Sequence, residues 1–532
     1  MKRWLPLAVL AAAQFVMVLD QAVMNVSISQ LVVDLDTDVT AIQAVITLYS
    51  LVMAMFMIAG GKVGDLIGRR PAFTLGLIIY AVGSSITALA PNVVVLAVGW
   101  SVLEGLGAAL VMPALAALIA GSYQGRQRAI AYSVIGAVAG AGIAVGPILG
   151  GWATTNLTWR VVFVGEVVVV LGVLACVRLL RDPPGDAARP RFDLVGVWLS
   201  ALGLGLIVYG LLRAGTWGWF VPKAAPVTPF GFAPTPFVIA TGGLVLWLFV
   251  GWQRRREASD TDPLVHLDLL RIPALRAGLQ SFLAQNLILM GVFFTVPLYL
   301  QLVLGLDALE TGVRMLPVSI AMFVAAIAGA RLRTWFAVRT VVRAGFVSAI
   351  LAILLLLSTV EPTLLRTPFA VAMALLGVGM GLIASQLGDV VQSSVDASGR
   401  SEAGGLQFTS MQLGSAVGVA LIGAIVLSGL VSNFLTQIEE DPRVPAAVVE
   451  EATIAVSGEV SFVPSDQVRA AAAEAGLEAE VVDALVADYE AAQLFALKTG
   501  LLACVLLGLL AFPATRQLPT ERPRAPGAQQ AS

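Results

Sequence analysis

Three acidic residues lie well inside long apolar stretches in the first half of the sequence, where charge is rare: Asp20, Glu104 and Glu166. A charged side chain at the centre of a membrane helix costs about 2.5–3.5 kcal/mol on insertion scales, so such residues usually serve a function. Burial favours the protonated form of a carboxyl, and neighbouring carboxyls favour it further. These three side chains are therefore candidates for proton coupling, taking up a proton on one side of a membrane and releasing it on the other.

A structural role is the alternative for each acid. Glu166, for example, could pair with Arg160, which precedes it by about one and a half helical turns. At 1.5 Å per residue, Glu104 lies roughly 16 Å and Glu166 roughly 9 Å below the outer start of its apolar segment. Asp20 falls in the outer half of its own segment. Because the three segments belong to one half of the chain, the acids could converge on one cavity.

The composition indicates a membrane protein. Of 532 residues, 58% are hydrophobic and 12% are charged, whereas a soluble domain carries about 25% charged residues. One histidine and two cysteines are too few for a zinc site, a disulfide framework or Cys-His catalysis. Gly61-Lys62 is followed by Val63, so this is not a phosphate-binding loop. We expect a protein that is not an enzyme and holds no metal or cofactor, with a proton gradient as its energy source.

Fourteen apolar segments are long enough to cross a bilayer as helices. Glycine, proline and charged residues separate them, and the eighth segment is the shortest. The fold class that this predicts is an all-α integral membrane protein. The segments lie near 5–31, 41–60, 72–90, 93–119, 129–152, 160–180, 194–213, 237–253, 277–302, 308–330, 340–359, 368–390, 404–430 and 490–512.

Basic residues alternate between the loops in a way that predicts the orientation. With the N-terminus in the cytoplasm, most of the 32 Lys and Arg residues fall on the cytoplasmic side. Both termini are then cytoplasmic and the chain is a multi-pass protein of the cytoplasmic membrane. The expected partners are a small-molecule substrate, protons and the lipid bilayer, without nucleic acid, and the chain is expected to act as a monomer.

The chain repeats a basic turn after the second and the tenth apolar segment. The first copy runs from Gly61 to Arg70, and a degraded copy runs from Gly329 to Arg339. Two halves of six spans with two inserted spans explain this spacing. The predicted domains are a six-helix bundle (1–180), a linker with two inserted spans (181–256), a second bundle with an external acidic helical loop at 431–489 (257–512), and a cytoplasmic tail (513–532).

The first basic turn has a pattern suited to a conformational latch. Its glycines permit a tight turn, and its carboxylate can pair with arginines or face a helix N-terminus. An ordinary positively charged loop is the alternative. The turn resembles the hallmark loop of the major facilitator superfamily, and the latch residues that this implies are Gly61, Asp65, Gly68, Arg69 and Arg70.

A glycine-rich run in the fifth segment adds to the resemblance. Small residues at four-residue spacing let helices approach closely, and a proline adds a bend. The run resembles the antiporter motif of drug-exporting facilitators, with Gly142, Gly146, Pro147, Gly150 and Gly151 in its order. Together with shorter motifs along the chain, such as Trp159-Arg160 and Pro297 to Gln301, it is similar to the fourteen-span drug:proton antiporter family. That resemblance implies two six-helix bundles plus two inserted spans.

The chain departs from this family in its fourth and sixth segments. The family usually carries R-x-x-Q-G-x-G in the fourth segment, and its arginine is implicated in proton coupling. Here Ser101 replaces the arginine and Glu104 the glutamine, while Glu166 stands where the family commonly has asparagine. A coupling scheme that depends on that arginine cannot be carried over to this chain.

Five further residues are candidates for contact with the substrate. Aromatic faces can bind a cationic or aromatic ligand, and amides at mid-depth can contact it by hydrogen bonds, although packing and interhelical hydrogen bonding are equally open. The candidates are Asn25, Tyr49, Trp100, Gln285 and Asn286.

The resemblance and the buried acids together predict proton-coupled efflux of small lipophilic or cationic compounds by alternating access, as in multidrug efflux and antibiotic resistance. Export of a lipid or a self-made metabolite is an alternative, and loss of the fourth-segment arginine leaves an uncoupled facilitator open. A membrane sensor that does not transport is disfavoured because the sequence contains no sizeable cytoplasmic domain.

Overall fold

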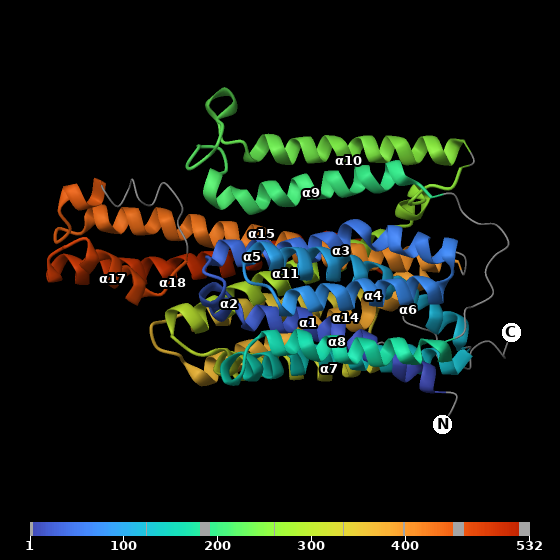
Figure 1. Ribbon diagram of the computed structural model, residues 1–532. Coiled ribbons are helices and arrows are strands. Elements are labelled where there is room, and N and C mark those ends of the chain that lie inside the picture. Colours follow the sequence, from blue (N-terminus) through green and yellow to red (C-terminus); the bar gives the residue numbers. More distant parts are fainter. Residues whose placement is uncertain are drawn as a thin grey trace.

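The computed structural model describes residues 4–123, 125–180, 192–259, 261–332, 335–396, 399–450 and 462–520. These residues form helices that run side by side, and they contain no strand (Figure 1). Thirteen of the described helices are long and apolar enough to cross a membrane. A further long helix, α7 (Gly125–Asn156), has its side chains described only in part and packs between α1 and α12 as the fourteenth. The prediction of an all-α integral membrane fold is confirmed.

The first half of the chain contains six long helical segments. α5, η1 and α6 follow one another without a break and form the fourth of these segments, in which η1 is a π-helix. The elements are α1 (Leu5–Val26), α2 (Ile28–Asp34), α3 (Val39–Ile67), α4 (Arg69–Ala88), α5 (Val93–Leu96), η1 (Ala97–Glu104), α6 (Gly105–Ser122), α7, α8 (Arg160–Cys176) and η2 (Val177–Leu179).

The second half repeats this arrangement. α11 packs on α15 and α18 as α1 packs on α7 and α8, and α13 packs on α14 and α18 as α4 packs on η1 and α8. The elements are η4 (Leu267–Arg271), α11 (Pro273–Leu298), η5 (Tyr299–Val303, a second π-helix), α12 (Ala308–Leu332), α13 (Val338–Leu357), α14 (Arg366–Ser393), α15 (Arg400–Glu440), α17 (Ser465–Glu474), α18 (Ala479–Leu510) and η6 (Ala514–Gln517).

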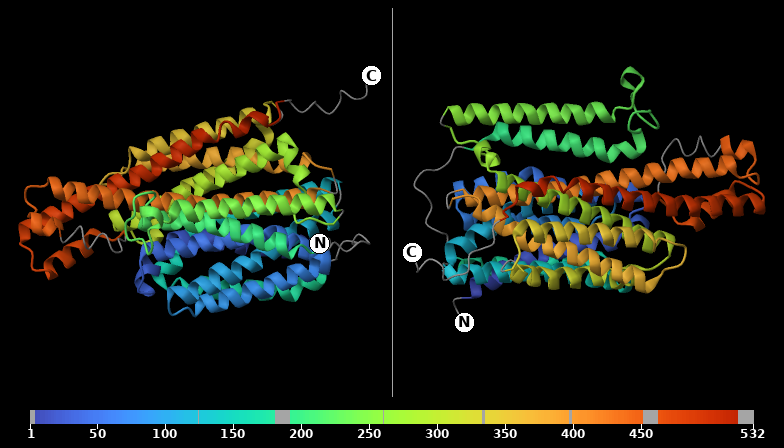
Figure 2. Two further views of the ribbon diagram at one scale, coloured as in Figure 1. Left: turned by 90° about the horizontal axis from the view of Figure 1, so that it is seen from above. Right: turned by 180° about the vertical axis from the view of Figure 1, so that it is seen from behind.

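The two halves meet along two seams, α3 with α15 and α7 with α12. We call the end of the molecule at which α1 begins and α18 ends the terminal end, and the opposite end the far end (Figure 2). At the far end, Gln301 donates a 2.9 Å hydrogen bond to the carbonyl of Val26 and accepts one of 3.2 Å from the N–H of Ser29. The N–H of Leu309 donates to Thr155 across the α7–α12 seam. The halves are therefore joined at the far end.

Two inserted helices lie outside the two bundles. α9 (Leu194–Trp217) packs against α3 and α15, and α10 (Thr235–Ala258) packs against α9 (Figures 1 and 2). The connection between them contains η3 (Pro229–Gly231). The predicted linker before α9 lies at residues 181–191, outside the described residues, as does most of the predicted tail, at 521–532.

The last two long helices extend beyond the apolar segments that the sequence shows. α15 continues to Glu440 and α18 begins at Ala479, and both project from the far end together with α17 (Figure 2). The stretch after Pro464 does not run on into the final span, because Gly476 with a φ of +75° separates α17 from α18. The hydroxyl of Tyr489 on α18 donates to the carbonyl of Val463, just before α17, and so joins the start of α17 to α18.

Candidate functional site

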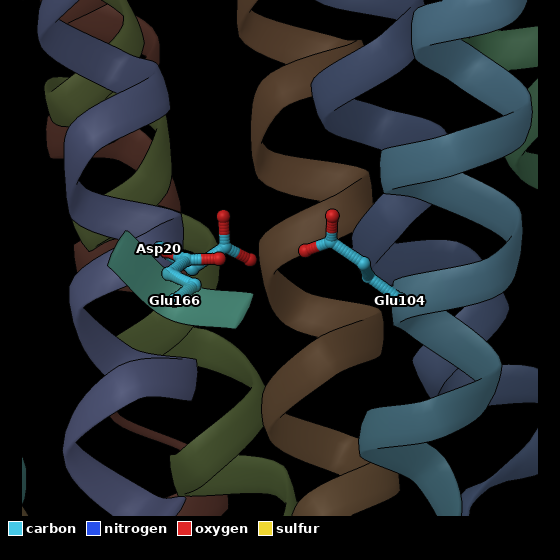
Figure 3. Close-up of side chains that lie close together, drawn as sticks. All are labelled: Asp20, Glu104 and Glu166. Atoms are coloured by element: carbon cyan, nitrogen blue, oxygen red, sulfur yellow. The ribbon is translucent and has the colours of Figure 1, made fainter. Parts of the chain in front are cut away.

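Three carboxyls come together inside the first half of the chain. Asp20 lies on α1, Glu104 ends η1, and Glu166 lies on α8; one carboxylate oxygen of each lies within 4.8 Å of the others. We call these three side chains the acid cluster. Their carboxyl groups point toward one another (Figure 3). The relative exposure is 0% for Asp20 and Glu104 and 2% for Glu166, so the cluster is enclosed by protein.

Each carboxyl of the acid cluster accepts hydrogen bonds from neutral donors. The indole N–H of Trp100 donates to Asp20 Oδ1 at 2.7 Å, and the hydroxyl of Thr87 donates to Glu104 Oε1 at 3.0 Å. The hydroxyls of Tyr80 and Ser84 donate to Glu166 Oε2 at 3.3 and 3.4 Å. The second oxygen of every carboxyl is buried without a hydrogen-bond partner. The arrangement thus leaves three acceptor oxygens enclosed by protein and without a partner among the described residues.

The donors on α4 are site residues that the sequence analysis missed. Tyr80, Ser84 and Thr87 fall at positions i, i+4 and i+7, so they share one face of the helix. Polar residues at this spacing in an otherwise apolar segment are the signal that could have found them. Glycines bring the helices together there, because a Cβ at Gly83 would lie 2.7 Å from Cγ of Glu104, and one at Gly99 the same distance from Oγ1 of Thr87.

The π-helix η1 places both Trp100 and Glu104 at the cluster. Single π-turns inside α-helices are rare and occur frequently at functional sites. Within η1, Trp100 reaches toward α1 while Ser101 turns away and donates to the carbonyl of Val45 on α3. Ser101 stands where the resembled family has an arginine, and here it bonds to backbone rather than to a carboxyl.

Of the predicted substrate contacts, the structure brings two to the acid cluster. Tyr49 stacks face to face on Trp100 with ring centroids 4.5 Å apart, and its buried hydroxyl has no hydrogen-bond partner. The other three candidates are amide side chains, and each donates to a backbone carbonyl in a helix: Asn25 to Gln21, Gln285 to Met380 and Asn286 to Phe282. Gln285 and Asn286 lie in the other half of the chain, on α11.

Glu166 does not pair with Arg160, which was the structural alternative for this acid. Arg160 donates a 2.8 Å hydrogen bond to the carbonyl of Ala90, lies 3.7 Å from Asp34 and covers the ring of Trp159. This group is partly exposed near the far end, whereas Glu166 points into the bundle. The partners of Glu166 are therefore the two hydroxyls on α4 and the other acids.

The acid cluster is also the set of side chains, among the described residues, with the spacing of a metal site. Its ligands would all be oxygen, which suits Mg²⁺ or Ca²⁺, yet those ions take six or more ligands. Each carboxyl already spends one oxygen on a neutral donor, so three oxygens remain. The donor set fits protons better than a divalent cation.

The predicted latch residues lie in the turn between α3 and α4. Asp65 pairs with Arg69, which also donates a 3.0 Å hydrogen bond to the carbonyl of Gly61. Gly68 has a φ of +100°, a conformation that a residue with a side chain rarely adopts. The carbonyl of Arg70 accepts from Thr74 in the first turn of α4. These contacts lie within the turn itself and in the start of α4.

The glycine-rich run of α7 touches the helix that carries Asp20. A Cβ at Gly142 would lie 3.0 Å from Val18, one at Gly150 would lie 2.9 Å from Val23, and one at Gly146 would collide with Ala22. On its other side, α7 contacts α12: a Cβ at Gly151 would collide with the carbonyl of Ala308, and the carbonyl of Pro147 occupies the space beside Gly312. The run therefore links α1 to the second half of the molecule.

The sequence matches known proteins over most of its length. Residues 10–419 match the family described as Major Facilitator Superfamily. The chain is 30% identical to the probable actinorhodin transporter of Streptomyces coelicolor, covering 82% of this chain and 75% of that one. It is 31% identical to the puromycin resistance protein pur8 of Streptomyces alboniger, over 84% and 86% of the two chains. It is 29% identical to the tetracenomycin C resistance and export protein of Streptomyces glaucescens, over 87% and 83%.

Two solved structures have the same fold. One is a bacterial homologue of the human lysosomal transporter Spinster in an inward-facing, unoccupied conformation, with a TM-score of 0.60, 15% identity and coverage of 97% of this chain and 98% of that one. The other is an auto-inhibited peptide transporter of the POT family, with a TM-score of 0.59, 15% identity and coverage of 99% of both chains.

Proposed function

Because the chain belongs to the major facilitator superfamily, we propose that it exports small lipophilic or cationic compounds in exchange for protons, by alternating access. It is a multi-pass membrane transport protein rather than an enzyme. Its relatives include proteins named for antibiotic resistance and export. The proposal extends that activity to this chain and adds the proton as the coupling ion.

In this proposal the terminal end faces the cytoplasm and the far end faces outward, because this orientation places most basic residues inside. The protein then resides in the cytoplasmic membrane with both termini inside. The hydrogen bonds of Gln301 to Val26 of α1, and of Thr155 across the α7–α12 seam, join the two halves on the outer side. In this proposal one chain acts alone as a monomer, since the three acids of the cluster all come from a single chain.

The observation that carries the proposal is the acid cluster. Its carboxyls are enclosed, they accept hydrogen bonds from uncharged donors, and they keep three oxygens without partners. A group in such a place changes protonation when the cavity around it changes from outer to inner access. Protons enter from outside onto Asp20, Glu104 or both, the halves reorient, the protons leave to the cytoplasm, and a cationic substrate takes their place.

The contacts of α7 support a route from the acids to the seams. α7 packs its glycines on α1 beside Asp20 and packs its opposite side on α12. A movement of α1 that accompanies a change in the charge of Asp20 would therefore be transmitted through α7 to the α7–α12 seam. Close packing through small residues permits such sliding without side chains that must first move aside.

Transport in vesicles tests the proposal. The purified protein is placed in liposomes, and export of the lipophilic cation ethidium is measured with and without an imposed pH gradient. We expect the gradient to accelerate transport, and Glu104→Gln to abolish that acceleration. Asp466→Asn on α17 is the matched control, because its carboxyl is exposed on the far-end projection. Transport by Glu104→Gln that still follows the gradient would contradict the role given to this acid.

Export of a self-made metabolite is a second candidate, favoured by the relatives named for actinorhodin transport and tetracenomycin C export. A panel that spans actinorhodin, tetracenomycin C, lipids and lipophilic cations separates the two candidates. Transport that ignores the pH gradient for every compound in the panel would identify an uncoupled facilitator instead.

A further inference from the structure

We infer that the acid cluster carries at least two transported protons, so that more than one proton enters for each molecule exported. This inference rests on the proposed proton coupling and adds its stoichiometry. It follows from the enclosure of three carboxyls within 4.8 Å of one another, among described side chains that are acids or uncharged donors.

Three carboxyl oxygens of the cluster, Asp20 Oδ2, Glu104 Oε2 and Glu166 Oε1, are buried without a partner. Buried acceptors of this kind are costly unless a donor reaches them. Four of the surrounding hydroxyl and indole donors already bind the other oxygens. The hydroxyl of Tyr49, beside Asp20, is one further donor and can serve only one oxygen. Protons on the carboxyls themselves can serve the others.

Two protons are enough to connect the cluster. Two neutral carboxylic acids can each donate an O–H to the one carboxylate that remains, at the separation of up to 4.8 Å that small side-chain rotations close. One proton leaves two carboxylates side by side in a site enclosed by protein, which their mutual repulsion disfavours. The loaded cluster therefore holds two protons or three.

The described groups that face the acid cluster from the neighbouring helices do not supply a positive charge to compensate it. The side chains that interact with Asp20 are Trp100 of η1, Tyr49 of α3 and Tyr80 of α4. Glu104 is acted on by the other two acids and by Thr87 and Ser84 of α4. Glu166 is acted on by Asp20, Tyr80 and Ser84. All of these partners are either acids or neutral donors, so the negative charge is compensated by bound protons.

This stoichiometry has an electrical consequence. If two protons enter for each monovalent cation that leaves, one net positive charge moves inward in every cycle. The membrane potential alone then drives export. If one proton exchanges for one monovalent cation, the cycle moves no net charge and the potential alone drives nothing.

Proteoliposomes with equal pH inside and outside provide the test. A potential is set by a potassium gradient and valinomycin, and protein-dependent movement of ethidium is obtained by subtracting protein-free liposomes. For a ratio of two, we expect a tenfold ethidium gradient to be balanced by about 59 mV. Asp466→Asn is the matched control and is expected to give the same balance as the wild type.

Glu166→Gln identifies the second proton. The amide keeps an acceptor oxygen for Tyr80 and Ser84 but can no longer take up a proton. We expect this variant to remain responsive to a pH gradient while its dependence on the potential falls toward zero. An unchanged dependence on the potential would overturn the assignment of the second proton to the acid cluster.

The wild-type protein alone separates the two levels of the proposal. Transport driven by a pH gradient but not by the potential would overturn the inference of two protons and leave the proposed proton antiport standing. Transport that responds to neither gradient would overturn the proposed antiport itself. Transport driven by each gradient separately is the expected result.

Discussion

The indole N–H of Trp100 donates a 2.7 Å hydrogen bond to Oδ1 of Asp20, and the same ring lies flat on Tyr49. The side chain of Trp100 thus connects Asp20 on α1 to Tyr49 on α3. The bond crosses from the fourth segment of the chain to the first, so the geometry of Asp20 depends on the position of η1.

Trp100→Phe is expected to move the pH dependence of transport. Phenylalanine keeps the stack on Tyr49 but removes the donor that stabilises the ionised carboxyl of Asp20. A charge-assisted hydrogen bond contributes about 1.5–3 kcal/mol, so the proton is held more tightly and the pH of half-maximal transport rises by about one unit. Rates measured from pH 5.5 to 9, with Trp198→Phe on the exposed face of α9 as control, check this; an unshifted profile would contradict it.

Gly312→Val is expected to slow transport by more than tenfold. The side chain would collide with the backbone carbonyl of Pro147, so the α7–α12 seam could not close at the far end. Gly172→Val on α8 is the control, because a Cβ there meets nothing within 4 Å. Initial ethidium transport rates in proteoliposomes, normalised to the amount of reconstituted protein, provide the measurement. Equal rates for the two variants would show that this seam need not close tightly.

Asp65→Asn is expected to reduce the transport rate severalfold while leaving stability nearly unchanged. The pair with Arg69 is partly exposed, and pairs of this kind contribute about 0–1 kcal/mol. A latch, however, acts on the rate of reorientation rather than on the fold. Asp268→Asn, which breaks an exposed pair with Arg271, is the control. If both variants transport at the wild-type rate, the turn is an ordinary basic loop.

Asp193→Ala is expected to lower the free energy of unfolding by about 3 kcal/mol, the scale of breaking a buried polar network. Asp193 caps α9 through the N–H of Gly196 and accepts hydrogen bonds from Trp252 and Gln253 of α10. The variant would therefore detach the two inserted helices at their terminal end. Thermal unfolding in detergent, followed by the reaction of the buried Cys504 thiol with a fluorogenic maleimide, measures the loss; Asp268→Ala is expected to change it by less than about 0.5 kcal/mol.

The same carboxyl predicts a pH dependence. Burial alone would raise the pKa of Asp193, but the Gly196 N–H, Trp252, Gln253 and the charge of Arg256 together hold this pKa below its ordinary value. Its contribution is then complete above the unfolded value of about 3.9 and is lost as the pH falls through the lower folded value. The stability difference between wild type and Asp193→Asn should shrink below about pH 4. A difference that is constant from pH 7 to pH 3 would argue against this assignment.

The sequence was sufficient to predict the helical membrane fold, because apolar segments of about 20 residues have one stable form in a bilayer. It was less informative about helix ends. Hydropathy marks where the bilayer stops, while α15 continues as a helix through polar residues until Asp441 and Pro442. The convergence of Asp20, Glu104 and Glu166 was predictable as a possibility, since all three sit in one half of the chain.

The partners of the acids were not predictable in the same way. Thr87 meets Glu104 because glycines at 83 and 99 let α4 and η1 approach, which depends on the rotation of both helices. Trp100, predicted as a substrate contact, donates to Asp20, a bond that its residue type alone did not indicate. The amides of Asn286 and Gln285 bond to helix carbonyls, and residue type alone does not distinguish an amide that bonds to a helix from one that bonds to a ligand.

The inserted helices α9 and α10 make the molecule asymmetric in the plane of the membrane. α9 covers the α3–α15 seam, with α10 outside it, whereas Trp152 of α7 and Ile320 of α12 are exposed beside the other seam. The two halves repeat each other, but the two flanks of the transporter do not. A lipophilic molecule dissolved in the bilayer therefore reaches the junction of the halves directly from one flank. On the opposite flank, α9 and α10 lie between the bilayer and that junction.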